Sequence, residues 1–403
     1  MIAAPLRGIR VLDFGQGVAG PYCGQLLADQ GAQVVKIEPL RGDWSRTMGD
    51  PGAHGQSGVF VSVNRGKRGL SVDLRQPDAI EIVRGLAAQA DVVLESFRPG
   101  VMDRLGLGSA ELRRANPALV YCSVTGFGPD GPNADLPAGD STMQAYGGLM
   151  SIVGERDGQP LRVGNVVSDM LAGMNAFSGV LLALLQRRAG APGADVQVSL
   201  LDSIVAFQAP PLSEYLMTGQ LPQRLGNDHP LIAPSGAMRT SDGAICFTVF
   251  DHQWPAFCEG LGLPQLASDA RFASSGERQR HRDALRAALE PVFASGSRAE
   301  WLDRLRTLDV LCAPINDYRD LVADPQVRHN ALFERIEAGD GSYPAIRNPI
   351  RLGGAGGGAA GAPPRLGEHT RDILEHDCGI APERIEELLA HKVVLAAQET
   401  EHA

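Results

Sequence analysis

Residues 126–148 read GFGPDGPNADLPAGDSTMQAYGG, and an apolar run at 119–124 stands directly before them. The run has the composition of a buried strand. The glycines and prolines that follow end this strand, because they do not continue a sheet. We therefore expect a loop at the end of a strand, and then a helix that begins near Asp140.

Asp140 follows Gly139 at the expected start of that helix. Unpaired backbone N–H groups at a helix start favour a negative charge. An aspartate in this position usually caps the helix and has no other role. The same position also suits an ionised carboxylate that acts as a nucleophile, and the residue type alone does not choose between the two.

The bulk composition is that of an ordinary globular protein, with 403 residues, 44% of them hydrophobic and 21% charged. This length predicts two domains, or one large α/β unit with an inserted piece. The longest apolar candidate, 174–185, contains Asn175 and Ser178, so we expect no membrane span. The N-terminus enters a strand almost at once and leaves no room for a signal peptide, which predicts a cytoplasmic protein.

A formal charge of −10 disfavours nucleic acid as the main partner. The cysteines are scattered, with no Cys-x-x-Cys pair, and this pattern argues against a zinc site and a disulfide framework. We expect most of them to be buried thiols: Cys23, Cys122, Cys246, Cys258, Cys312 and Cys378.

Residues 8–38 have the pattern strand, glycine turn, helix, strand, which predicts a parallel βαβ unit. The turn contains Gly15, Gly17 and Gly20 in dinucleotide-fingerprint spacing, and Glu38 lies where a ribose-binding acid would fall. This fingerprint alone is weak, and Pro21 removes a backbone donor directly after it. An NAD-dependent oxidoreductase nevertheless remains an alternative.

Two further strands are expected at 70–74 and 91–97, with a helix between them that opens at Pro77. Basic residues gather around their ends, where a doubly wound sheet could hold phosphates. Acidic residues are interleaved nearly one for one, so a solvated surface is an equal alternative. The basic residues are Arg65, Lys67, Arg68, Arg75, Arg98 and Arg104.

The pattern of expected secondary structure changes after residue 225. Residues 237–250 have the pattern of a β-hairpin, and helices follow. Ser297 and Glu300 have capping-box spacing. We divide the chain into a first part of the large domain at 1–225, a small α+β domain at 226–310, and a return to the large domain at 311–403. Ser168 is expected to cap the apolar helix that follows it, and Asp169 in the first turn of that helix is interpreted as structural. The glycine-rich segment 353–361 is expected to be a flexible link.

The order of motifs resembles the class III coenzyme A transferases, the family of carnitine dehydratase and bile-acid-inducible proteins (CaiB/BaiF). The matching pieces run in the family's order over nearly the whole chain. They are Leu12-Asp13-Phe14 with Ala19-Gly20-Pro21, Val35-Lys36-Ile37-Glu38, the segments 94–100 and 126–132, Gly139-Asp140, 198–202, His229-Pro230, Asn348-Pro349-Ile350 and 364–370.

This resemblance implies an α/β fold, with a Rossmann-like parallel-sheet large domain and a smaller α+β domain, in an interlocked homodimer. It implies acyl-CoA and carboxylic acid substrates, no cofactor beyond the coenzyme A thioester, and no metal. The net charge and the apolar pattern described above are the grounds for expecting no nucleic-acid or membrane partner. The resemblance places the catalytic aspartate at Asp140. It places the coenzyme contacts at Gln16, Gly17, Val18, Ala19, Val72, Arg75, Ser96, Phe97, Val101, Arg104 and Leu105.

The implied reaction passes through an aspartyl anhydride and an aspartyl–CoA thioester. Carboxylate is a poor nucleophile toward a thioester, so the site must supply oxyanion donors. Candidates are the backbone N–H groups of 15–19 and those around Gly139 or Gly147, where glycine permits close approach.

The chain also departs from particular members of the family. Val18 and Pro39 stand where formyl-CoA transferases carry glutamine and arginine, and 227–235 lacks their glycine-rich lid, so formate and oxalate are not the expected substrates. Gly139 stands where the related racemases carry a histidine, so α-proton exchange would lack one of its two bases. An acyl-CoA racemase remains the first alternative to a transferase, ahead of the oxidoreductase. A dicarboxylate such as succinate, itaconate, mesaconate or citramalate is suggested by basic residues that could meet a second carboxylate: Arg41, Arg46, His54, Arg162 and His229.

Overall fold

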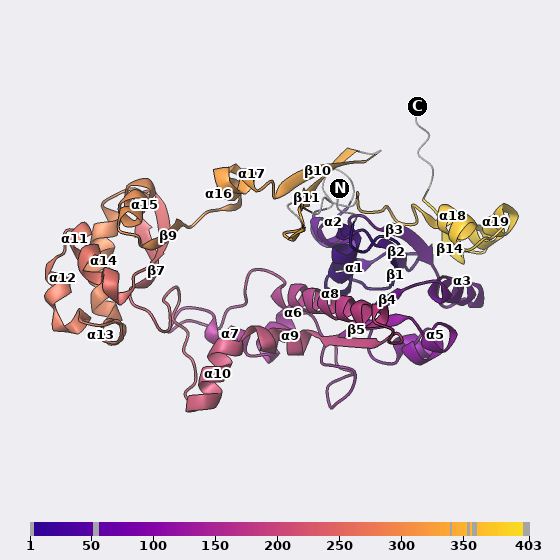
Figure 1. Cartoon of the computed structure of the whole chain (residues 1–403), viewed down its shortest axis with the longest axis horizontal. Helices are drawn as coiled ribbons and strands as arrows, with labels where there is room; N and C mark the ends of the chain where they lie inside the picture. Colours follow the sequence, from indigo (N-terminus) through magenta and orange to yellow (C-terminus); the bar gives the residue numbers. More distant parts are fainter. Residues whose placement is uncertain (1–3, 51–55, 339–340, 353–354, 357–360, 398–403) are drawn as a thin grey trace. The chain divides into compact units, whose positions relative to one another are not determined.

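The computed structural model describes residues 4–50, 56–338, 341–352, 355–356 and 361–397. The chain forms two compact units, which we call the large unit and the small unit. The large unit comprises 1–149, 162–218 and 328–403, and the small unit comprises 150–161 and 219–327. The elements of both units are labelled in Figure 1.

The large unit is built on a seven-stranded sheet with the order β14-β3-β2-β1-β4-β5-β6. All neighbouring strands are parallel except β14, which pairs antiparallel with β3. The order reverses between β1 and β4, so a crevice is expected at the carboxyl ends of these two strands. The strands are β1 Arg10–Asp13, β2 Gln33–Glu38, β3 Arg68–Val72, β4 Val92–Glu95, β5 Val120–Thr125, β6 Asp195–Ser199 and β14 Val394–Leu395. This order confirms the predicted Rossmann-like parallel core.

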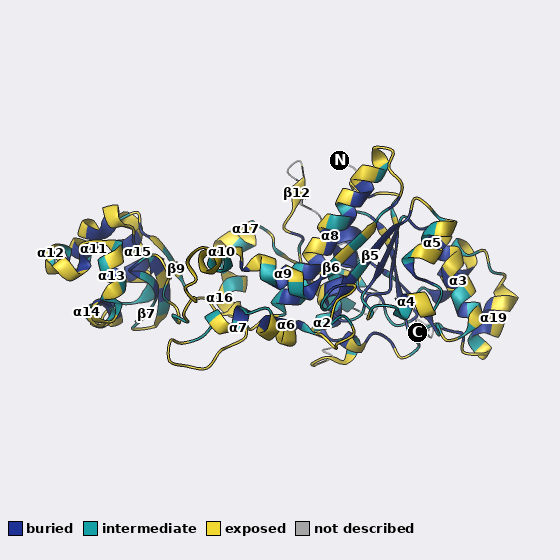
Figure 2. Cartoon of the chain, turned by 90° about the horizontal axis from the view of Figure 1, so that it is seen from below, coloured by how far each residue is buried: buried dark blue, intermediate teal, exposed yellow. Residues whose placement is uncertain are grey.

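Successive side chains of each strand point to opposite faces, and the sheet is therefore covered on both sides. In β1, Val11 packs in one core with α1 and α8, and Leu12 packs in the other core with α3 and α5. Figure 2 shows the strands of this sheet mostly in the colour of buried residues. This two-sided burial explains why the strands read as apolar runs in the sequence.

Helix α8, Val167–Arg188, is long and apolar enough to cross a membrane by length and composition, and it is the only such helix in the described part of the chain. It packs against α1, α9, β5 and β6. Ala172, Ala176 and Val180 are fully buried at helical spacing. These contacts are those of a helix that covers a sheet.

The remaining helices of the large unit connect the strands or extend the chain beyond them. Those before β6 are α1 Ala19–Asp29, η1 Trp44–Thr47, α2 Gly58–Asn64, α3 Pro77–Ala88, α4 Val101–Arg104, α5 Ser109–Ala115 and α6 Asp140–Tyr146. Those after β6 are α9 Leu200–Phe207, α10 Ala209–Thr218, α18 Thr370–Asp372, the π-helical turn η4 Ile373–Asp377 and α19 Pro382–Ala390. Two short antiparallel pairs also lie in this unit: β10 Phe333–Ala338 with β11 Gly341–Ile346, and β12 Arg351–Leu352 with β13 Ala355–Gly356.

The small unit has a three-stranded antiparallel sheet with the order β7-β8-β9. Its strands are β7 Ser235–Thr240, β8 Gly243–Thr248 and β9 Leu311–Pro314. The predicted hairpin is β7-β8, and the capping box of Ser297 and Glu300 opens α15 as predicted. Its helices are η2 Asp251–Gln253, α11 Trp254–Gly260, α12 Gln265–Ser268, η3 Ala270–Phe272, α13 Ser275–Arg280, α14 Arg282–Ala294, α15 Arg298–Thr307 and α16 Tyr318–Ala323. Two helices lie at the boundaries between the units, α7 Leu149–Ile152 and α17 Pro325–His329.

The boundaries of the small unit differ from the division at 226 and 310 made from the sequence. The run 311–314 does not return to the large unit, because β9 pairs with β8 as a third strand. Residues 150–161 also join the small unit, where the N–H of Gly226 donates to the carbonyl of Gly154 at 2.9 Å. The glycine-rich link at 353–361 falls largely outside the described residues.

Candidate active site

The glycine turn after β1 is held by three hydrogen bonds to side chains. The N–H groups of Gly15 and Gly17 donate to the carboxylates of Asp13, at 2.8 Å, and Asp43, at 3.1 Å. The N–H of Gln16 donates to the hydroxyl of Ser96 at 3.0 Å, which ties the end of β1 to the end of β4. These donors therefore already have partners within the chain.

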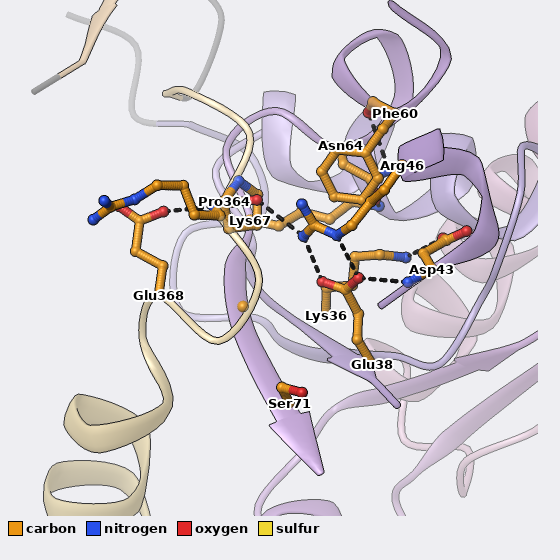
Figure 3. A network of polar contacts seen from close by, with 12 residues as sticks. Lys36, Glu38, Asp43, Arg46, Phe60, Asn64, Lys67, Ser71, Pro364 and Glu368 are labelled. Atoms are coloured by element: carbon orange, nitrogen blue, oxygen red, sulfur yellow. Dashed lines mark hydrogen bonds and ion pairs between the residues drawn. The ribbon is translucent and has the colours of Figure 1, made fainter. Parts of the chain in front are cut away.

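Buried charges contact this turn and fix its shape. Figure 3 shows Lys36, Asp43 and Lys67 in the polar network to which they belong. The Lys36 ammonium, which is fully buried, contacts Asp43 at 2.9 Å and the carbonyl of Gly15 at 2.8 Å. Lys67 contacts Asp13 at 2.7 Å and the carbonyl of Pro21 at 2.7 Å. Burial lowers the pKa of Lys67 to about 8, although Asp13 opposes that shift. For Lys36 the nearby carboxylates outweigh the effect of burial, so its pKa is raised.

Glu38 is part of the same network. Arg46 donates to both of its carboxylate oxygens, at 2.8 and 2.7 Å, and the guanidinium lies over the ring of Phe60 at 3.7 Å. Glu38 also accepts from the N–H of Asp43. The residue is 1% exposed, so the carboxylate that a dinucleotide would need for its ribose is already engaged. The oxidoreductase alternative loses its main support.

The residues that the resemblance assigns to coenzyme A follow the carboxyl ends of β1, β3 and β4. Gln16–Ala19 and Ser96–Phe97 meet at the point where the strand order reverses. Val18 and Val72 are buried, so neither presents an exposed side chain to a ligand. Arg75, after β3, is exposed and forms a bidentate pair with Asp73. Val101, Arg104 and Leu105 lie in and directly after α4, which follows β4.

The six basic residues at the strand ends do not form one cluster. Arg65 and Lys67 are buried against Asp29 and Asp13, and Arg68 pairs with Asp372 and Asp377. Arg75 pairs with Asp73. Only Arg98 and Arg104 are exposed and make no hydrogen bond or ion pair through their side chains within the described residues. Of the six basic residues considered as phosphate ligands, only these two therefore remain candidates.

Asp140 is the first residue of α6, with Gly139 as the N-cap residue. It is 7% exposed, and its carboxylate is held on both sides. Oδ1 accepts from the backbone N–H of Ser168 at 2.9 Å and from the Ser168 hydroxyl at 2.8 Å. Oδ2 accepts from the side-chain amide of Gln144 at 2.7 Å. The carboxylate is thus fixed in one orientation, with fewer donors on Oδ2 than on Oδ1.

Ser168 and Gln144 are contacts of Asp140 that the sequence analysis did not find. Ser168 was predicted to cap α8, but the N-cap residue is Val166, and the Ser168 side chain turns to Asp140 instead. Gln144 is one helical turn after Asp140, and it is fixed by the N–H of Val163 and the carbonyl of Asn165. The i, i+4 spacing of Gln144 was the one signal in the sequence that could have revealed this contact.

Asp169 lies beside this carboxylate in the first turn of α8. Burial, with a contribution from the negative charge of Asp140, raises the pKa of Asp169 to about 7. Two carboxylates that interact in this way resist carrying two charges at once. Asp169 therefore interacts electrostatically with Asp140. The sequence analysis interpreted Asp169 as structural only and did not predict this interaction.

Five of the oxyanion donors proposed from the sequence are engaged elsewhere. Gly15, Gln16 and Gly17 donate to side chains as described above, Gly139 donates to the hydroxyl of Thr142, and Gly147 donates to the carbonyl of Met143. Within the part of the chain that the structure describes, no group of three His, Cys, Asp or Glu residues is arranged to hold a metal ion. The polar groups of Ser168 and Gln144 converge instead on the carboxylate of Asp140.

Comparison with known proteins identifies the family. The family model described as CoA-transferase family III matches residues 6–370. The chain is 37% identical to a succinate–glutarate CoA-transferase of Agrobacterium fabrum, over 92% of this chain and 95% of that protein. It is 38% identical to an acetyl-CoA:oxalate CoA-transferase of Acetobacter aceti, over 87% and 90%.

Among solved structures, a CaiB/BaiF family protein from Brucella suis is similar, with a TM-score of 0.84 and 36% identity over 92% of this chain and 98% of that one. The fold is thus that of an acyl-CoA-handling α/β enzyme. The chain belongs to CoA-transferase family III, and it is a CoA-transferase.

Proposed function

We propose that the protein transfers coenzyme A from an acyl-CoA donor to a carboxylic acid acceptor, and that the acids are dicarboxylates. The single observation that carries the catalytic part is the Asp140 carboxylate, held by Ser168 and Gln144 at the start of α6. The dicarboxylate part is supported by relatives whose names include succinate, glutarate, mesaconate and citramalate.

In this proposal Asp140 attacks the thioester carbonyl of the donor, and the carbon–sulfur bond breaks to give an aspartyl anhydride and CoA thiolate. The thiolate then attacks the aspartyl carbonyl, and the donor acid leaves. The acceptor carboxylate attacks the resulting thioester, and the steps run in reverse. The carboxylate needs no proton transfer, because it is already the ionised nucleophile.

The coenzyme is proposed to lie along the carboxyl ends of β1, β3 and β4. Gln16–Ala19, Val72, Arg75, Ser96, Phe97, Val101, Arg104 and Leu105 would contact it, with Arg104 bound to a phosphate. The support for Arg104 is that its exposed guanidinium has no acidic partner within the described residues. Coenzyme A is a substrate in this proposal, and no further cofactor takes part.

The structure leaves fewer candidates among the residues proposed to bind a second carboxylate. Arg46 is engaged by Glu38, and His54 lies outside the described residues. Arg41 and Arg162 are exposed on the large unit, and His229 is exposed on the small unit. These three remain candidates, and the structure does not test His54. Formate and oxalate remain the acids not expected as good substrates.

The test replaces Asp140 by Asn or Ala. Each variant should lose at least about 10³-fold in kcat, because the nucleophile is removed. Transfer from succinyl-CoA to glutarate, followed by mass spectrometry, measures the rate. Trapping of the wild-type protein with acyl-CoA and hydroxylamine should place label on Asp140. A folded Asn variant that transfers CoA at the wild-type rate, or label only on Asp169 or Asp202, would disprove the assignment.

The same proposal includes a cytoplasmic, interlocked homodimer. The dimer is supported by α10, which has no buried residue and exposes Leu216 and Met217. Figure 2 shows α10 in the colours of exposed and intermediate residues. Apolar side chains that a single chain leaves uncovered indicate an interface.

A further inference from the structure

We propose that Ser168 forms the oxyanion hole for the second chemical step, in which the CoA thiolate attacks the aspartyl carbonyl. This inference depends on the proposed role of Asp140 as nucleophile. It assigns separate tasks to the two oxygens of Asp140, with Oδ2 as the attacking atom and Oδ1 as the atom that later carries the negative charge.

The first step of the argument is the unequal hydrogen bonding of the two oxygens. Oδ1 accepts two bonds, from the N–H and the hydroxyl of Ser168, at 2.9 and 2.8 Å. Oδ2 accepts one bond, from Gln144. A carboxylate oxygen has about two lone-pair sites, so Oδ1 is saturated and Oδ2 retains a free lone pair. Oδ2 is therefore the oxygen available to attack the thioester.

The second step follows the electrons. Once Oδ2 has formed the anhydride, Oδ1 is the oxygen of the aspartyl carbonyl. The thiolate sulfur bonds to Cγ, and the π electrons of the Cγ–Oδ1 bond move onto Oδ1. The pair then returns, the Cγ–Oδ2 bond breaks, and the donor acid leaves as a carboxylate that carries Oδ2. No proton is gained or lost, because the attacking sulfur is already ionised.

The third step is the position of the donors. Two donors that already lie within hydrogen-bond distance of Oδ1 need no reorganisation when the charge develops there. Ser168 is fully buried, so water does not compete for these bonds. The N–H of Ser168 also belongs to the first turn of α8, where backbone donors have no partner within the helix. Gln144 faces the departing oxygen and can stabilise the leaving carboxylate in the same step.

Ser168→Ala removes the hydroxyl and keeps the backbone donor. We expect kcat to fall about 10²-fold, since the charge that develops on Oδ1 loses one of its two donors. The KM for acyl-CoA should not change, because Ser168 is not among the proposed coenzyme contacts. Rapid quenching with acyl-CoA alone, followed by intact mass, should show the CoA adduct on Asp140 forming more slowly by the same factor. Ser168→Thr, which keeps a hydroxyl, should restore most of the rate.

Ser178→Ala is the matched control, because Ser178 lies on the same helix and donates only to the carbonyl of Met174. Thermal melting of each variant checks that it is folded, and if Ser168→Ala is unfolded, Ser168→Thr and Ser168→Cys are compared in its place. A folded Ser168→Ala or Ser168→Cys variant that forms the adduct at the wild-type rate would overturn this proposal. An active Asp140→Asn variant would instead overturn the proposed function, so the two failures are distinguishable.

Discussion

Asp169 and Asp140 are close enough that the charge of one affects the other. Burial, and then the charge of Asp140, raises the pKa of Asp169 from about 3.8 to about 7. The folded protein therefore holds a proton on Asp169 more tightly than the unfolded chain does. The stability that this proton contributes is fully present below about pH 3.8 and is lost as the pH rises through about 7.

Asp169→Asn should remove that loss, because the amide is neutral at every pH. The difference in melting temperature between the variant and the wild type should increase in the variant's favour from pH 4 to pH 7, and then level off. Calorimetry at one-unit pH steps measures it. If the difference between the two melting temperatures did not change with pH, the raised pKa of Asp169 would be contradicted.

The glycine turn after β1 depends on charges that the strands and helices around it bury. Asp43 accepts from the N–H groups of Gly17 and Ser45 and pairs with Lys36, and both members of the pair are fully buried in their side chains. Removing one partner of a buried pair leaves an uncompensated charge, which costs more than the pair itself contributes.

Asp43→Ala should therefore lower the free energy of unfolding by about 3–5 kcal/mol. Addition of Lys36→Met should recover part of the loss, because it removes the unpaired charge. The matched control is Asp73→Ala, whose partner Arg75 is exposed, and it should change stability by at most about 1 kcal/mol. Urea unfolding of the four proteins gives the comparison, and equal losses for Asp43→Ala and Asp73→Ala would show that burial does not decide the cost.

The elements themselves were largely predictable from the sequence, and their long-range partners were not. Apolar runs with short helices between them predicted the parallel strands, and the turn at 241–243 predicted the hairpin. Asp140 was predicted at the start of its helix, because a glycine followed by an acidic residue is a local signal for a helix N-terminus. Ser168 lies 28 residues away from Asp140, and only the packing of α6 against α8 brings the two together.

The same limit explains the basic residues at the strand ends. Their number was visible in the sequence, but the acids that neutralise them were not. Arg68 pairs with Asp377, which is 309 residues further along the chain, and Lys67 pairs with Asp13, 54 residues before it. Which cations remain for a phosphate depends on these pairs, and local composition does not record them.

In the molecule as a whole, the chain passes between its two units at 149/150, 161/162, 218/219 and 327/328. Such repeated passage, together with the uncovered apolar residues of α10, is consistent with the proposed interlocked dimer. Two chains that thread through each other cannot separate without unfolding. Ordinary dimers, in contrast, exchange subunits by dissociation and reassociation.

The protein should therefore elute at twice its chain mass of 42.7 kDa, and native dimers should not exchange subunits. Mixing tagged and untagged dimers, followed by native mass spectrometry, should give no hybrid after prolonged incubation. The control is the same mixture unfolded in urea and refolded together, which should give hybrids in the statistical ratio, because the chains then thread anew. A monomeric mass would contradict the dimer, and hybrids that form without denaturant would contradict the interlock while leaving the dimer in place.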